Sequence, residues 1–211
     1  MEIISCTRCY WAPALVALVA VASCRINGAP RNDLTAKQTN AGVAAATWQS
    51  DLALAQQAER KREHFQARTH YQAAYRHATT TQDQARVAQN FADTLLSWGE
   101  FAEAQAQLEL VVKHLPSQAA GWHDLGMVRY RLGLPAGAEV AFRRAIALVP
   151  AEPRPRIALA ALLWANLRRG DALREYQALQ QLALPAPVRR KVDWAIAQLS
   201  APANATPTAA P

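Results

Sequence analysis

Residues 119–150 read AAGWHDLGMVRYRLGLPAGAEVAFRRAIALVP, and this stretch decides the fold. Its spacing of large, small and turn-forming residues returns when the sequence is read 34 positions earlier and 34 positions later. Self-similarity at a fixed period of this size predicts copies of one supersecondary unit stacked in a row. The matched positions are Trp122, Leu125, Gly126, Tyr130, Gly133, Ala138, Phe142, Ala145 and Pro150; Ala88, Phe91, Ala92, Leu96, Gly99, Ala104, Leu108, Val111 and Pro116; and Arg156, Leu159, Ala160, Trp164, Leu167, Ala172, Tyr176 and Leu179.

Each position of the pattern has a packing reason. Gly126 and Ala138 are small where two helices of a hairpin would cross, and Phe142 would fill the wedge between hairpins. Gly133 suits the left-handed turn that ends a first helix, and Pro150 cannot continue a second one. The 47 alanines among 211 residues also favour closely packed helices.

This set of residues resembles the tetratricopeptide (TPR) repeat, a helix-turn-helix with the pattern W-x₂-L-G-x₂-Y…A-x₃-F…P. The resemblance implies an all-α protein, a TPR-type α-solenoid of about four helix-turn-helix repeats with a C-terminal capping helix. A generic alanine-rich bundle is the alternative. The first repeat fits the frame only after a three-residue offset. The expected array covers 48–200, with repeats at about 48–81, 85–118, 119–152 and 153–186 and the cap helix at 187–200.

The match is weaker at both ends of the array. Arg62 and Leu167 stand where a turn glycine is expected, and Gly170-Asp171 predicts that the break of the fourth repeat shifts by three residues. In the last helix, Val188, Val192 and Leu199 share an apolar face, which predicts a solvating cap. Residues 201–211 are rich in Pro, Ala and Thr and predict a disordered tail.

The N-terminus has the features of an export signal. Residues 9–24 form an uncharged run of about 24 Å as a helix, short of the ~30 Å hydrocarbon core, which favours a signal peptide over a permanent span. Val21-Ala22-Ser23-Cys24 resembles a bacterial lipobox. The resemblance implies a lipoprotein signal peptide at 1–23 and acylation of Cys24, with palmitate-type chains that hold the protein to a membrane.

Two other outcomes remain open for this segment. Ala20-Val21-Ala22 also fits an ordinary cleavage site, which would give a secreted periplasmic protein without a lipid anchor, and an uncleaved N-terminal anchor is the third possibility. Residues 24–47 have few large apolar side chains and predict a flexible tether. Arg25 after the acylated cysteine implies, by the same resemblance, the cell outer membrane and a position that faces the periplasm.

No motif in the sequence indicates catalysis, a cofactor or a small-molecule substrate. It contains no G-x-S-x-G, P-loop or H-E-x-x-H pattern, so we expect no enzyme. His64, His70 and His77 lack the spacing of a metal site and are interpreted as surface histidines. The net charge of +7 could suit nucleic acid, but an exported protein meets none. Anionic envelope polymers or an acidic protein partner fit the charge better.

The candidate binding residues follow from the resemblance. TPR arrays bind an extended or helical protein segment along the concave face of their first helices. The Lys and Asn clamp of chaperone-binding TPRs is replaced here, so we expect apolar anchors and a nearby carboxylate on the partner. Tyr130 and Trp164 could instead serve mainly in packing. The inward positions that form the expected groove are Arg86, Gln89, Asp93, His123, Met127, Tyr130, Arg131, Arg154, Ile157 and Trp164.

These features predict a non-catalytic, lipid-anchored TPR scaffold for protein–protein interactions in the bacterial cell envelope. TPR lipoproteins of type IV and Flp (Tad) pilus assembly are similar in layout, which implies a role in pilus or secretion-system assembly. The alternative is a TPR adaptor that regulates a cell-wall hydrolase.

Overall fold

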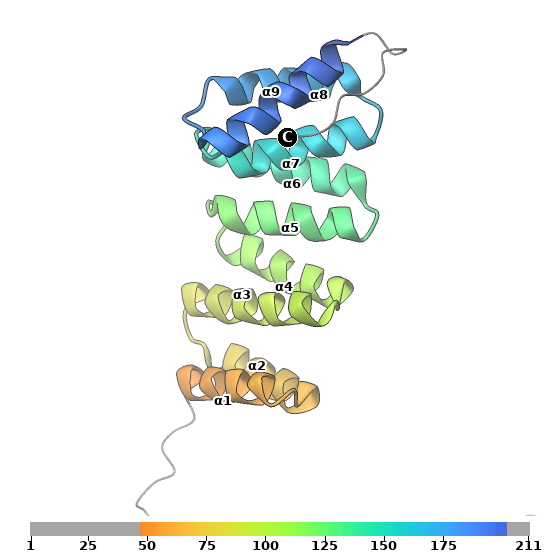
Figure 1. Ribbon diagram of the computed structural model, residues 1–211. Coiled ribbons are helices and arrows are strands. Elements are labelled where there is room, and N and C mark those ends of the chain that lie inside the picture. Colours follow the sequence, from red (N-terminus) through yellow and green to blue (C-terminus); the bar gives the residue numbers. More distant parts are fainter. Residues whose placement is uncertain (1–46, 202–211) are drawn as a thin grey trace, which may run out of the picture. The chain divides into compact units, whose positions relative to one another are not determined.

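The computed structural model describes residues 47–201, and the predictions for the signal peptide, Cys24, the tether and the tail lie outside this range. Within it the chain forms nine α-helices and no β-strand (Figure 1). None of these helices is both long and apolar enough to span a bilayer. Their bounds are α1 (Trp48–Arg60), α2 (His64–His77), α3 (Thr81–Trp98), α4 (Phe101–His114), α5 (Ala119–Arg131), α6 (Pro135–Leu148), α7 (Pro153–Ala165), α8 (Arg169–Gln180) and α9 (Ala186–Ser200).

The helices form four successive antiparallel hairpins, and each hairpin packs on the next along the chain (Figure 1). The α-solenoid expected from the 34-residue period is therefore confirmed, and the generic bundle is not what the chain adopts. The first repeat is offset by three residues from the 34-residue frame because of the length of α3. At 18 residues, α3 is one turn longer at its N-terminus than the other first helices, and it begins at Thr81 instead of the expected 85.

Small residues set the distance between the two helices of each hairpin. Ala92, Ala104, Ala138, Ala160 and Ala172 are fully buried. Gly126 is also buried, and a Cβ atom there would lie 2.5 Å from the ring of Phe142. Close approach of the backbones thus depends on the absence of side-chain volume at the crossing.

The turn between the helices of a hairpin has the same backbone in all four repeats. Gly99 and Gly133 adopt the expected left-handed conformation, with φ of 81° and 72°. Arg62 and Leu167 adopt it too, at 60° and 61°. In each case the next residue donates its N–H to a carbonyl five residues earlier, as in the Schellman motif that closes a helix.

The predicted three-residue shift at Gly170-Asp171 is wrong. The fourth hairpin turns at Leu167, in register with the others, and α8 already begins at Arg169. Burial of Ala172 at the helix crossing fixes this register, so Leu167 takes the left-handed backbone despite its side chain.

Leu167→Gly is expected to stabilise the protein. The left-handed conformation costs a non-glycine residue about 1–2 kcal/mol. Relief of this cost stabilises the variant, but the greater backbone entropy that glycine loses on folding offsets about 0.5–1 kcal/mol of it. The Leu167 side chain is 86% exposed, so its removal sacrifices little burial. Denaturant unfolding should show a gain of about 0.5–1 kcal/mol, whereas Gly99→Ala, the reverse change, should show a loss. A destabilised Leu167→Gly variant would contradict the backbone assignment.

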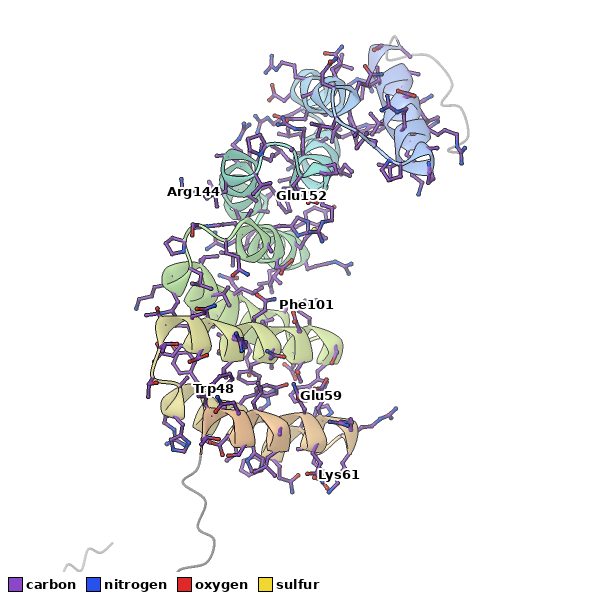
Figure 2. The ribbon with its side chains drawn as sticks, turned by 90° about the vertical axis from the view of Figure 1, so that its left-hand side faces the viewer. Trp48, Glu59, Lys61, Phe101, Arg144 and Glu152 are labelled. Atoms are coloured by element: carbon purple, nitrogen blue, oxygen red, sulfur yellow. The ribbon has the colours of Figure 1, made fainter. Side chains whose placement is uncertain are left out.

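The two ends of the stack differ in how they close. Gly121, Leu125 and Val128 of α5 are buried against the preceding hairpin. The equivalent face of α1 has no preceding hairpin within residues 47–201, and it carries Ser50, Leu54 and Gln57, which are all exposed. Trp48 and Lys61 mark the two ends of this helix in Figure 2.

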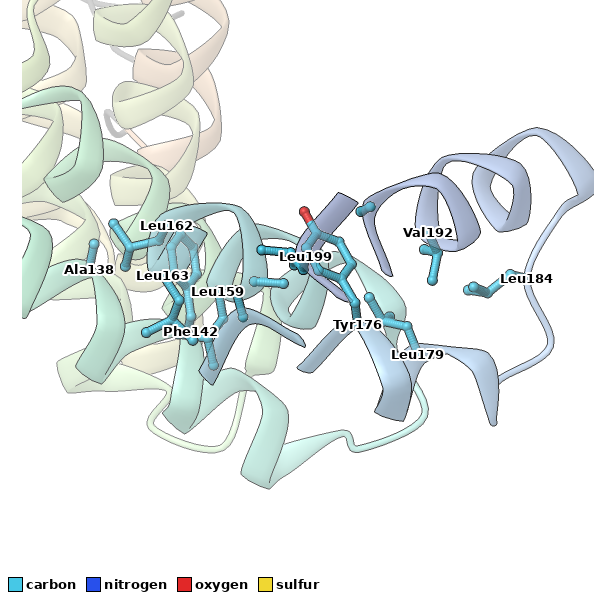
Figure 3. Close-up of a cluster of buried hydrophobic side chains, with 13 residues drawn as sticks. Ala138, Phe142, Leu159, Leu162, Leu163, Tyr176, Leu179, Leu184, Val192 and Leu199 are labelled. Carbon is cyan, nitrogen blue, oxygen red and sulfur yellow. The ribbon is translucent and has the colours of Figure 1, made fainter. Parts of the chain in front are cut away.

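At the other end, α9 covers the last hairpin. Val192, Ala195 and Leu199 of α9 join Tyr176 and Leu179 in one buried cluster (Figure 3). The helix therefore packs on α8 as predicted for a cap, in the place that the first helix of a fifth repeat would take.

Candidate functional site

A row of cavities runs over the first helices of the second, third and fourth hairpins. The central cavity has a volume of about 340 Å³ and lies between α5, α6 and α7. Its walls are mostly apolar, with a histidine and an arginine at the edge. The lining residues are His123, Met127, Tyr130, Phe142, Arg154, Ile157, Ala158, Ala161 and Leu162.

Two further cavities continue the row, one on each side. A cavity of about 320 Å³ shares Met127 with the central one, and it is lined by Leu96, Phe101, Asp124, Val128 and Arg131. A larger cavity of about 500 Å³ shares Ile157, and its other lining residues are Trp164, Tyr176, Val188, Lys191, Val192, Trp194 and Ala195. We call the three neighbouring cavities the groove.

The structure brings most of the sequence-predicted residues to the groove, but not all of them. His123, Met127, Tyr130, Arg154 and Ile157 line the central cavity, while Arg131 and Trp164 line its two neighbours. Arg86 and Gln89 line a separate, polar cavity of about 280 Å³ next to α4. Asp93 lines none of these cavities and instead accepts a hydrogen bond from Gln89.

A polar cluster lies at the α3 end of the groove. The Gln89 amide donates to Asp93 at 3.1 Å and to Asp124 on α5 at 3.3 Å, so one side chain bridges two carboxylates. Asp124 also lies 3.1 Å from His123 Nδ1. Partial desolvation raises the pKa of Asp93, and the nearby charge of Asp124 acts in the same direction. This end therefore places two carboxylates close together, with Arg131 in the same cavity as Asp124, and both His123 and Asp124 line the groove.

Tyr130 and Trp164 differ in their surroundings. Tyr130 is 47% exposed in the central cavity and has its ring available to a ligand. Trp164 is half-buried: its ring meets Tyr176 edge-on at 6.2 Å and lies 5.8 Å from Trp194. Packing between helices therefore accounts for part of the role of Trp164, but it does not account for Tyr130.

The cations of the groove are not equivalent. The Arg154 side chain donates to Glu152 at 2.7 Å, and this bond raises the pKa of Arg154, so its charge already has a partner. Within residues 47–201, Arg131 has no ion pair. Arg86 lies over the ring of Trp48, 5.6 Å from its centroid. Of the three arginines expected to meet a partner carboxylate, Arg131 is the one that lies in the groove without an ion pair to the described residues 47–201.

Much of the remaining positive charge is used inside the stack. Arg129 pairs with Glu109 at 3.1 Å, Arg168 with Glu139 at 2.7 Å, and Arg156 with Glu175 at 2.8 Å. The first two pairs join neighbouring hairpins. Such bridges explain part of the arginine content without a ligand.

Two of the histidines interpreted as surface groups have partners. His64 stacks on Trp98 with ring centroids 4.1 Å apart, and His77 Nδ1 lies 2.6 Å from the buried carboxylate of Asp51. Both contacts join different helices and are structural. Among the residues that the structure describes, no three His, Cys, Asp or Glu side chains gather as metal ligands would.

Sequence reasoning missed the contribution of α9 to the groove. Val188, Lys191 and Trp194 line the largest cavity, although the helix was predicted only as a solvating cap. Ala158 was missed because it follows the predicted inward position Ile157 by one residue. Counting α9 as the first helix of a fifth repeat, 34 residues after the fourth, would have placed Val188, Lys191 and Ala195 at inward positions.

The arrangement of hairpins in residues 47–201 defines a TPR-type α-solenoid. Solved structures with the same fold include Pseudomonas aeruginosa PilF (21% identity, TM-score 0.57, 72% of this chain and 68% of that one) and MamA (15% identity, TM-score 0.61, 72% and 80%). The first TPR domain of Spaghetti (RPAP3), bound to the HSP90 peptide SRMEEVD, is similar at 18% identity and a TM-score of 0.50, over 55% of this chain and 90% of that one. No family model and no curated protein matches the chain.

Proposed function

We propose that this protein is a non-catalytic scaffold that binds an extended or helical segment of a partner protein in the groove. The observation that carries the proposal is the row of three neighbouring cavities, which share Met127 and Ile157 as lining residues. Concave, mostly apolar sites with a few polar groups at the edge suit a ligand that inserts apolar anchors. Tyr130 and Met127 are exposed there, while Arg131 provides an unpaired charge at the rim.

The similar RPAP3 domain is bound to an HSP90 peptide, which supports a peptide as the kind of ligand. The ligand of this chain must differ from the HSP90 peptide. At the positions of the carboxylate clamp this chain has Gln89 with Asp93 and His123 with Met127, and the first pair belongs to an acidic cluster. A terminal carboxylate at that end of the groove would be repelled.

We further propose that the scaffold serves pilus or secretion-system assembly in the cell envelope, held to the outer membrane through acylated Cys24. The lipobox-like Val21-Ala22-Ser23-Cys24 supports the anchor. The fold shared with PilF supports an assembly role, at the level of architecture alone.

Partner capture with a groove variant tests this function. The double change Tyr130→Ala and Arg131→Ala removes an exposed ring and an unpaired charge, and should reduce recovery of the partner at least tenfold, since interface aromatics and arginines dominate binding. The matched control is Val140→Ala with Arg144→Ala on α6, where Val140 is 63% exposed. Figure 2 places Arg144 and Phe101, a groove residue, on different sides of the stack.

Mass spectrometry of the captured proteins separates the assembly role from the alternative. Pilus or secretion-system components that depend on Tyr130 and Arg131 would support the proposal, and a cell-wall hydrolase would support the adaptor role. Equal recovery by the groove variant and the control, with unchanged helical circular dichroism, would place the binding site elsewhere.

A further inference from the structure

The largest groove cavity lies where the TPR repeats end. Its volume is about 500 Å³, within the range of ligand sites, and its walls come from α7, α8 and α9. Two of its lining residues, Tyr176 and Val192, also belong to the buried cluster of the last hairpin (Figure 3), so the core holds this part of the wall in place. The cap helix therefore encloses a site as well as covering the core.

The walls of this cavity are suited to an aromatic side chain. Trp164, Tyr176 and Trp194 surround it, and aromatic rings prefer the edge-to-face and offset geometries already seen between them. Ile157, Val188 and Ala195 complete an apolar lining. An inserted ring would thus meet other rings and aliphatic carbon.

The net charge of the basic and acidic residues at the rim is positive. Lys191 lines the cavity and has neither an ion pair nor a hydrogen bond with any residue of 47–201. Of the nearby acids, Glu175 pairs with Arg156 at 2.8 Å, whereas Asp193 accepts a hydrogen bond from the neutral amide of Gln180 at 2.9 Å and offsets one of the basic charges of α9. Arg189 and Arg190 precede Lys191 and add to the positive potential of the helix.

We propose that this cavity is an anchor subsite that takes an aromatic side chain from an acidic segment of the partner, with a carboxylate of that segment bound by Lys191. The subsite rests on the proposed groove function and gives the bound segment a direction. Its aromatic and acidic part lies at α9, away from the α3 end where Gln89 bridges Asp93 and Asp124.

Fluorescence anisotropy with the full chain in detergent micelles tests the subsite. The probes are three labelled peptides of about ten residues. The first has a central Trp-Leu pair flanked by Glu, the second has Lys in place of each Glu, and the third has Ala in place of Trp. We expect the acidic Trp peptide to bind at least ~10-fold more tightly than either of the others.

Charge reversal on the protein provides the matched comparison. Lys191→Glu should lower the affinity for the acidic peptide about 5- to 10-fold and reduce the dependence of that affinity on salt concentration. Arg144→Glu, the same change on an exposed residue of α6, should alter affinity less than about twofold. Circular dichroism should be the same for both variants.

The results separate this inference from the groove function on which it rests. Equal peptide affinities, or equal effects of Lys191→Glu and Arg144→Glu, overturn the subsite. If partner capture still depends on Tyr130 and Arg131 in that case, the groove function stands without the subsite. If capture does not depend on them, the groove function fails independently of the peptide result.

Discussion

Replacing Gly126 by leucine is expected to lower the free energy of unfolding by roughly 3 kcal/mol, the cost of overpacking a tight core. The first atom of any side chain at this position would lie 2.5 and 2.6 Å from two ring carbons of Phe142. Phe142 is 1% exposed, so its ring is packed on almost all sides and can give way only toward the central cavity that it lines. A leucine at position 126 would therefore disturb the crossing of the third hairpin and the central cavity together.

Urea unfolding measures this loss, and Gly170→Leu is the matched control. Gly170 lies in α8, and a Cβ there would meet nothing within 4 Å. Leucine is the better helix former by almost 1 kcal/mol, so the control should be neutral or slightly more stable. Equal stability of the two variants would mean that the α5–α6 crossing is not as tight as described.

Changing Cys24 to alanine is expected to transfer the protein almost completely from the detergent phase to the soluble periplasmic fraction. The sulfur of Cys24 is the proposed site of acylation, and each buried methylene of a lipid chain contributes about 0.8 kcal/mol to membrane binding. Several chains together hold a protein to a bilayer, and none would remain in the variant. Phase partition followed by immunoblotting measures the distribution.

Cys9→Ala, in the proposed signal peptide, is the control and should leave the distribution unchanged. The same experiment separates the three outcomes for the N-terminus. A wild-type protein already in the soluble fraction would indicate ordinary secretion. A Cys24→Ala variant that stays with the membrane at full length would indicate an uncleaved anchor.

The repeat frame could be predicted from sequence because packing restricts its residues strongly. Positions such as Gly126 and Ala138 accept only small side chains, and the closely packed crossing then fixes both helices around them. The turns were harder to predict. Arg62 and Leu167 adopt the glycine-like conformation because the helices on either side impose it, and local sequence preference does not reveal such tertiary constraints.

The groove could be predicted only in part, for a related reason. Inward positions follow from the repeat frame, so Met127, Tyr130 and Ile157 were found. The pairing of charges across helices does not follow from that frame. Arg154 was expected to meet a ligand and instead pairs with Glu152, and Lys191, in the helix predicted as a solvating cap, lines a cavity.

The hairpins of this chain touch essentially their immediate neighbours, and this pattern has a mechanical consequence. In a stack whose hairpins are linked in series, small rotations at successive junctions add up along its axis. The distance between the α3 end and the α9 end can therefore change without the loss of any helix. Such compliance would let one chain accommodate partners whose anchoring side chains are spaced differently.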